Sequence, residues 1–295
     1  MHPSVFYKYT SANTASIVLE SSRLRWSSPL LFNDVAEFQR MPRFDPTIAD
    51  ANALLSELIA SVVFDGVAID EERMGAPMKL LLECARHLVG NGLSRARLIE
   101  LLRVEQPDAD QKVERELRRF FEQRGLNRAR VLCVTTTYMN DAMWGNYAES
   151  HTGCVLGFRH IAERSTPLLE AQQVSYCEDQ PIVGSGLDFL LYGDSPELRA
   201  RTIHAVCYTK KTGWSYEQEW RCLTWRPNEV TKQHGDYLFY PEELESVTLG
   251  VRSTDGTERL LRDLLVKKYS NAKLFRMQII NGDLKRTALP LPPVT

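Results

Sequence analysis

Short runs of aromatic and β-branched residues predict β-strands toward both ends of the chain. Near the start, residues 5–10 and 23–27 have this character and are separated by a predicted helix over 13–20. Further predicted strands follow the middle of the chain, at residues 131–134, 154–158, 174–176, 204–208, 247–251 and 275–279. A Gly/Asp/Pro-rich connection is predicted over 179–196, either as a lid or as a plain loop.

From about residue 51 to residue 121 the apolar positions instead recur every three or four residues, which is typical of helices. One predicted helix carries Leu54, Leu58 and Val62, and a second, behind Pro77, carries Leu82 and Ala85. Two more follow, the first opened by Ser94. We therefore expect one α+β domain over residues 1–295, with a mixed sheet interrupted by a helical insertion over 45–130.

Composition narrows the possible environments of the protein. With 43% hydrophobic residues and a formal charge of −2, the 295-residue chain can fill a core and has no overall attraction to nucleic acid or anionic membranes. It starts without a secretory signal, and no apolar run approaches the roughly 18 residues that span a bilayer. We expect a cytoplasmic protein that does not enter the membrane.

The cysteines and histidines predict no metal site. The six cysteines are scattered singly, mostly beside Val or Leu, so we expect reduced, buried thiols. Neither a C-x-x-C pair nor an H-E-x-x-H helix is present.

The strongest candidate for chemistry is the stretch 214–221, Trp-Ser-Tyr-Glu-Gln-Glu-Trp-Arg. If this stretch is a strand, Glu217, Glu219 and Arg221 share one face, with the two carboxylates roughly 6.5 Å apart. Such a pair suits acid/base work or the stabilisation of positive charge at an anomeric carbon. Alternatively, both glutamates are solvated and neutralised by Arg221, Lys210 and Lys211.

A second candidate is an aromatic helix face that starts near Asp141. Trp144, Tyr147 and His151 recur at helical spacing, and Gly153 is expected to stop the helix. The two aromatic side chains either anchor the helix on the sheet or offer a stacking wall to a planar ring. His151 is expected to cap the helix end.

A third feature is a run of arginines around residues 115–130, which gives the end of the insertion a basic surface. The run consists of Arg115, Arg118, Arg119, Arg124, Arg128 and Arg130. Most such faces are merely solvated, and contact with nucleic acid is the alternative.

Several short motifs together resemble a bacterial family of domains of unknown function. They are Tyr7-Lys8-Tyr9, Leu24-Arg25-Trp26-Ser27, Phe32-Asn33-Asp34, Met143-Trp144-x-x-Tyr147-Ala148 and Tyr216-Glu217-x-Glu219-Trp220-Arg221. The pattern is similar to that of ADP-ribosyltransferase-like folds, in which an opening strand grips NAD and a later E-x-E triplet carries the catalytic glutamate. The resemblance implies a sheet of that type and NAD as substrate, without a metal.

Carried onto this sequence, the resemblance makes Glu219 the catalytic acid and Glu217 the residue that faces the acceptor. It implies NAD contacts from Lys8, Tyr9, Arg25, Ser27, Trp144, Tyr147 and Arg221. Lys8 stands where a histidine is often found, and a lysine cannot reproduce the contacts of an imidazole.

The function implied is that of an ADP-ribosyltransferase or NAD glycohydrolase, such as a toxin or phage-defence effector that modifies nucleic acid or protein. Two alternatives use the same residues: a nucleosidase or glycosidase, and a non-catalytic module that binds a nucleotide through Trp144 and Tyr147. A metal-dependent nuclease built on Asp34, Glu37 and Glu219 is possible in principle, although their spacing does not require it.

Overall fold

The structure is a computed structural model that describes residues 2–104, 106–124, 128–226 and 231–291, with the backbone alone at residues 123 and 124. The chain divides into two compact units. The first comprises Met1–Val35, Arg124–Tyr176 and Lys210–Thr295, and the second comprises Ala36–Gln123 and Cys177–Thr209.

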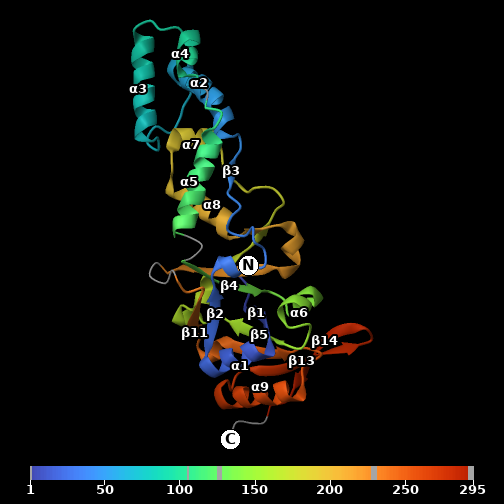
Figure 1. Ribbon diagram of the computed structural model, residues 1–295. Helices are drawn as coiled ribbons and strands as arrows, with labels where there is room; N and C mark the ends of the chain where they lie inside the picture. The colour runs from blue at the N-terminus through green and yellow to red at the C-terminus, as the bar shows by residue number, and fades with distance from the viewer. Residues whose placement is uncertain (1, 105, 125–127, 227–230, 292–295) are drawn as a thin grey trace. The chain divides into compact units, whose positions relative to one another are not determined.

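The first unit is built on a mixed sheet, which has ten strands among the described residues (Figure 1). Its main order is β11-β2-β4-β1-β5-β12-β13-β14, with β10 on β4 and β6 on β10. The β12/β13 pair is parallel and the other pairs are antiparallel. The strands are β1 (Val5–Thr10), β2 (Arg23–Ser27), β4 (Ala129–Thr135), β5 (Cys154–Arg159), β6 (Gln172–Gln173), β10 (Glu219–Trp225), β11 (His234–Leu238), β12 (Leu244–Leu249), β13 (Lys273–Ile280) and β14 (Asp283–Leu289).

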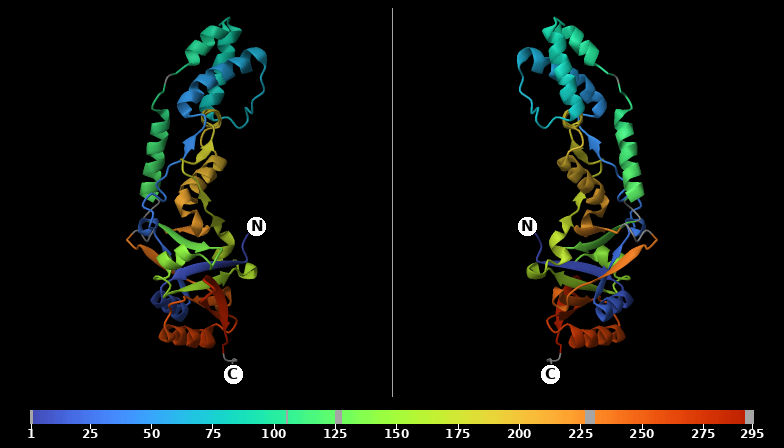
Figure 2. Two further views of the ribbon diagram at one scale, coloured as in Figure 1. Left: turned by 90° about the vertical axis from the view of Figure 1, so that its right-hand side faces the viewer. Right: turned by 90° about the vertical axis from the view of Figure 1, so that its left-hand side faces the viewer.

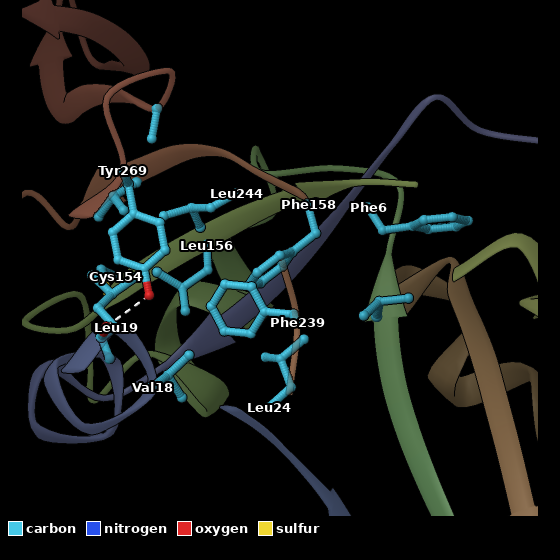
Figure 3. Close-up of a cluster of buried hydrophobic side chains, with 14 of the residues drawn as sticks. Phe6, Val18, Leu19, Leu24, Cys154, Leu156, Phe158, Phe239, Leu244 and Tyr269 are labelled. Carbon is cyan, nitrogen blue, oxygen red and sulfur yellow. Dashed lines mark hydrogen bonds between the residues drawn. The ribbon is translucent and has the colours of Figure 1, made fainter. Parts of the chain in front are cut away.

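Helices α1 (Ala12–Ser21) and α9 (Asp255–Lys268) cover one face of this sheet and lie side by side (Figures 1 and 2). Their apolar residues join the main core of the unit, which includes Leu19, Leu156 and Phe158. Figure 3 shows this core, in which the Tyr269 hydroxyl donates to the Leu19 carbonyl at 2.7 Å. The bond satisfies a polar group inside an apolar cluster and ties α9 to α1.

Helix α6 (Asp141–Tyr147) packs on the opposite face. Its residues Met143 and Trp144 join a second cluster with Tyr9, Val155 and Met277. Because neighbouring side chains on a strand point to opposite faces, Val155 belongs to this cluster while Leu156 belongs to the main core. The sheet is therefore covered on both faces.

Short elements complete the first unit. Strand β7 (Ser175–Tyr176) pairs with β9 (Thr209–Lys210), the strand that carries Lys210. The 3₁₀ turns are η1 (Pro29–Leu31), η2 (Ala162–Arg164), η3 (Pro167–Glu170), η4 (Thr212–Glu217) and η5 (Pro241–Glu243).

The second unit is mainly helical. It contains α2 (Ile48–Asp65), α3 (Ala76–Gly90), α4 (Arg95–Leu102), α5 (Ala109–Arg124), α7 (Gly186–Tyr192), α8 (Pro196–Cys207) and the parallel strands β3 (Arg43–Phe44) and β8 (Ile182–Gly184). Ile59, Leu82 and Leu98 form one of its cores. No helix within the described ranges is both long and apolar enough to cross a bilayer.

The predicted α+β class with a mixed sheet is confirmed, as are the four helices between residues 48 and 124. Two local predictions are wrong. Residues 204–207 end helix α8 instead of forming a strand, and the predicted loop over 179–196 contains α7. The Ser195 side chain caps α8 by accepting the Leu198 N–H, and Pro196 occupies the first turn of this helix. A serine followed by a proline is a typical helix start, so these two residues predict one here.

Candidate functional site

The stretch 214–221 is not one continuous strand. Residues Thr212–Glu217 form the 3₁₀ turn η4, Gln218 takes a left-handed conformation with φ 45°, and β10 begins at Glu219. Only Glu219 and Arg221 therefore share a strand face, and Glu217 reaches the site from the turn. In this arrangement both glutamates accept a hydrogen bond from Lys210. These buried ion pairs outweigh the tendency of residues 214–218 to form a strand.

Four charged side chains form a buried cluster at this junction: Lys210, Glu217, Glu219 and Arg221. The Lys210 Nζ lies 2.7 Å from the Glu217 Oε2 and 3.2 Å from the Glu219 Oε2. The Arg221 Nε and Nη2 donate to the two Glu219 oxygens at 2.8 and 3.0 Å. The lysine side chain is 6% exposed and the arginine 1%. The glutamates are therefore paired and buried, not solvated as in the alternative prediction.

Each of the four charged side chains contacts at least one of opposite charge, which offsets part of the cost of burying them. Burial alone would raise the pKa of Glu219, but Arg221 and Lys210 outweigh it and lower that pKa to about 2. Glu219 is therefore ionised at neutral pH. This state suits electrostatic stabilisation of a neighbouring cation and does not suit proton donation.

The lowered pKa of Glu219 predicts an acid-sensitive contribution to stability. The folded-state pKa is about 2 against an ordinary 4.5, so the contribution is complete above pH 4.5 and is lost as the pH falls toward 2. Its size is on the order of 3 kcal/mol, at about 1.4 kcal/mol per pKa unit.

Urea unfolding of wild type and Glu219→Gln at several pH values measures this contribution. We expect the difference in unfolding free energy between the two proteins to narrow between pH 4.5 and 2. A difference that stays constant over this range contradicts the assigned ion pairs.

Tyr147 connects the cluster to helix α6. Its hydroxyl donates to the Glu217 Oε1 at 2.6 Å and accepts from the exposed Asn33 Nδ2 at 3.3 Å. Burial, followed by the charge of Glu217, raises the pKa of Tyr147, so the phenol stays protonated and donates to the carboxylate. Tyr147 is half-buried and Asn33 is exposed, so this chain of hydrogen bonds runs from Glu217 toward solvent.

Tyr176 on β7 holds the start of β10. Its hydroxyl accepts the Glu219 backbone N–H at 2.8 Å, and burial raises its pKa to about 12. A tyrosine from a separate strand thus fixes the backbone from which Glu219 projects.

Two aromatic rings lie against the buried cations. The Lys210 Nζ is 4.6 Å from the centroid of the Trp214 ring, and the Arg221 Cζ is 5.5 Å from that of Phe32. Both rings are half-buried. Like Tyr147, they combine contact with the charges and partial exposure, which suits the stacking of a planar ligand group.

Lys8 adjoins the cluster through β4. Its Nζ donates to the Cys133 carbonyl at 2.9 Å, and Cys133 lies directly opposite Arg221 across the β4/β10 pair. Burial, and then the charge of Glu219, raise the pKa of the Cys133 thiol well above its ordinary value. The thiol is therefore protonated and is not a nucleophile at neutral pH.

The other residues predicted to contact NAD lie apart from the charges or inside the fold. Trp144 is 0% exposed and its Nε1 donates to the Tyr138 carbonyl at 2.9 Å, so it anchors α6 and leaves no ring face for a ligand. Tyr9 is buried, and its hydroxyl accepts the Asn140 N–H. Arg25 pairs at the surface with Asp236, and Ser27 lies opposite Val131 on β4.

The helix that carries Tyr147 ends earlier than predicted. It stops at Tyr147, and residues 149–151 have left-handed backbone conformations. The imidazole of His151 does not serve as the expected cap: its ring stacks on the Trp144 ring, and the bond to the Trp144 carbonyl, at 3.2 Å, comes from the His151 backbone N–H.

The predicted basic surface is only partly present. Arg118 and Arg119 pair with Glu114 and Glu116 on the same helix, and Arg130 is fully buried. The side chain of Arg124 lies outside the described residues.

The thiols and metal-ligand types are distributed as follows. All six cysteines are free, but Cys84 is exposed and Cys133 and Cys177 are half-buried, so the expectation of buried thiols holds only for Cys154, Cys207 and Cys222. In the described ranges, no three His, Cys, Asp or Glu side chains converge as metal ligands.

The sequence pattern did not indicate three residues of the site: Lys210, which contacts both carboxylates, Tyr176, which accepts the Glu219 backbone N–H, and Asn33, which donates to Tyr147. For Lys210 the sequence predicted no more than a neutralising charge near solvent. The signal available for it was a lysine a few residues before Glu217 and Glu219, in a chain segment otherwise rich in aromatic residues.

Comparison with protein families places part of the site within a known family model. A family model described as "Protein of unknown function (DUF2971)" matches residues 143–222. This segment includes Tyr147, Tyr176, Lys210 and the Glu217–Arg221 junction. No curated protein and no solved structure matches the chain.

Proposed function

We propose that this protein is an ADP-ribosyltransferase-like enzyme that uses NAD and transfers ADP-ribose to a protein or nucleic-acid acceptor. In this proposal the mixed sheet of the first unit is of the ADP-ribosyltransferase type, and the E-x-E triplet at residues 217–219 carries the chemistry.

The observation that carries the proposal is the convergence of Glu217 and Glu219 on Lys210. Two carboxylates from consecutive elements are held within one buried, ordered cluster whose outer side presents Tyr147 and Asn33. A ligand that displaces the neutral Tyr147 hydroxyl gains contact with Glu217. Contact with Glu219 would require displacement of the fully buried Arg221, so Glu217 is the better candidate for direct contact with substrate.

The proposed reaction breaks the bond between the ribose C1′ and the nicotinamide nitrogen. The bonding electrons leave with nicotinamide, and C1′ develops oxocarbenium character that a nearby carboxylate stabilises. A lone pair of the acceptor then forms the new bond to C1′, and the acceptor proton passes to Glu217. Lys210, Glu219 and Arg221 hold Glu217 in place.

The half-buried aromatic rings supply the remaining requirement, a surface for nicotinamide. Trp214, Phe32 and Tyr147 all border the charged cluster. They replace Trp144 as candidates for stacking, because the Trp144 ring is buried.

Incubation of the purified protein with NAD and a panel of other nucleotides and nucleosides tests the proposal, with chromatographic detection of released bases. Release of nicotinamide from NAD is expected. Release of a base from other nucleotides, without cleavage of NAD, would instead identify a nucleosidase. Release of no base from any member of the panel, with binding retained, would leave the non-catalytic nucleotide-binding alternative.

A further inference from the structure

A second polar group lies on the same face of the sheet, away from the charged cluster. The guanidinium of Arg286 on β14 is stacked between two rings, with its Cζ 3.6 Å from the Phe275 centroid and 4.4 Å from the Tyr138 centroid. Its Nε and Nη2 are buried and have no hydrogen-bond partner among the described residues. Two buried hydroxyls on β12, Ser246 Oγ and Thr248 Oγ1, also lack a partner there.

Tyr7 joins these groups into one cluster. Its ring packs edge-on against Tyr138 at 5.2 Å and lies over Gly157, where an added Cβ would stand 3.2 Å from the ring and 2.4 Å from the Ser246 Oγ. Burial raises the pKa of the Tyr7 phenol, and the nearby charge of Arg286 offsets part of that rise. The arginine, the phenol and the Ser246 hydroxyl therefore gather around Gly157.

The strand registers connect this cluster to the carboxylates. Directly paired residues on adjacent strands point to the same face. One such row crosses six strands, in the order Glu219, Thr135, Tyr7, Gly157, Ser246 and Lys273. Tyr7 is two strands from Glu219, roughly 10 Å at the usual strand spacing. The apolar cluster that contains Tyr7 and Tyr138 also includes Tyr147, the partner of Glu217.

We infer that Arg286, with Tyr7, Ser246 and Thr248, forms an anion subsite that binds the phosphate groups of a nucleotide lying along this face. Buried guanidinium N–H groups are costly without acceptors, and phosphate oxygens are well matched to them. Lys273 adds a positive charge to the same row. The nearby carboxylate of Glu245, whose charge contributes to the raised pKa of Tyr7, opposes it. The choice of a nucleotide rests on the proposed function, since the phosphates of NAD are one ribose away from its anomeric carbon.

This subsite takes over the role expected of Lys8 and Arg25. Lys8 is bonded to the Cys133 carbonyl, and Arg25 to Asp236. Arg286 lies outside every motif that pointed to NAD, so the sequence pattern did not indicate it.

Calorimetric titration with pyrophosphate and with ADP-ribose tests the inference on the full chain. Wild type is expected to bind both, and Arg286→Gln to bind each at least about tenfold more weakly, the usual effect of losing a charge-assisted bond. Lys285→Gln is the matched control, because it removes a positive charge at the exposed neighbouring position on β14. Its affinity is expected to stay within about twofold of wild type.

Tyr7→Phe is a second test of the subsite that remains valid if Arg286→Gln does not fold. This variant keeps the aromatic ring and removes only the hydroxyl. It is expected to bind pyrophosphate several-fold more weakly with an unchanged melting temperature. The inference is overturned if wild type binds neither probe, or if Arg286→Gln binds both as tightly as wild type does. Loss of ADP-ribose binding in Arg286→Gln without any NAD cleavage by wild type would sustain the subsite and refute the transferase.

Discussion

Replacing Lys210 by methionine is expected to destabilise the protein by about 3–5 kcal/mol, the usual cost of removing one partner of a buried ion pair. Lys210 is the cation shared by Glu217 and Glu219, so its loss removes an ion-pair partner from each of these two buried carboxylates. Methionine keeps the apolar stem of the side chain, so the loss reports the charge. Urea unfolding at pH 7 measures the change.

Lys211→Met is the matched control, because Lys211 is the next residue and is exposed. It is expected to change the unfolding free energy by less than about 0.5 kcal/mol. Similar stabilities for the two variants would show that the Lys210 pairs contribute little and that the cluster is not held as described.

Replacing Glu217 by glutamine is expected to reduce the rate of nicotinamide release by about 10²–10³-fold, the usual effect of removing one group that stabilises transition-state charge. Glutamine keeps the shape of the side chain but removes the charge opposite the developing oxocarbenium ion. Lys210 retains Glu219 as a partner, so the variant is expected to fold. Single-turnover measurement of nicotinamide release gives the rate.

Glu149→Gln serves as control, because this exposed glutamate follows α6 in the same unit. Its rate is expected to equal that of wild type. Glu219→Gln is less informative for catalysis, because it leaves Arg221 buried without its carboxylate and so also destabilises the fold. Full activity in Glu217→Gln would remove this residue from the mechanism.

Much of the sheet was predictable because its strands are dense in apolar and β-branched residues. This composition predicts the strands Val5–Thr10 and Cys154–Arg159. The structure of residues 204–207 was not predictable in this way, because the sequence His-Ala-Val-Cys is compatible with a strand and with a helix end. The capping Ser195 and Pro196 upstream decide in favour of the helix, and a window centred on the apolar run misses them.

The acidic pair was predictable in identity but not in geometry. The spacing of Glu217 and Glu219 suggested a shared strand face, whereas the left-handed Gln218 separates a turn from a strand. The surrounding residues Tyr147, Tyr176 and Asn33 come from distant segments, and their convergence depends on tertiary packing that spacing does not encode. For Trp144 the sequence left two roles open, an anchor for the helix or a stacking wall, and its burial in the fold decides for the anchor.

A crystal structure of the protein with bound ADP-ribose tests most directly whether the charged cluster is a nucleotide site. We expect the ribose that carries nicotinamide in NAD to hydrogen-bond Glu217 in place of the Tyr147 hydroxyl. The phosphates are expected at Arg286. Ligand density elsewhere on the protein, with the bonds from Tyr147 and Lys210 to Glu217 unchanged, would contradict the account.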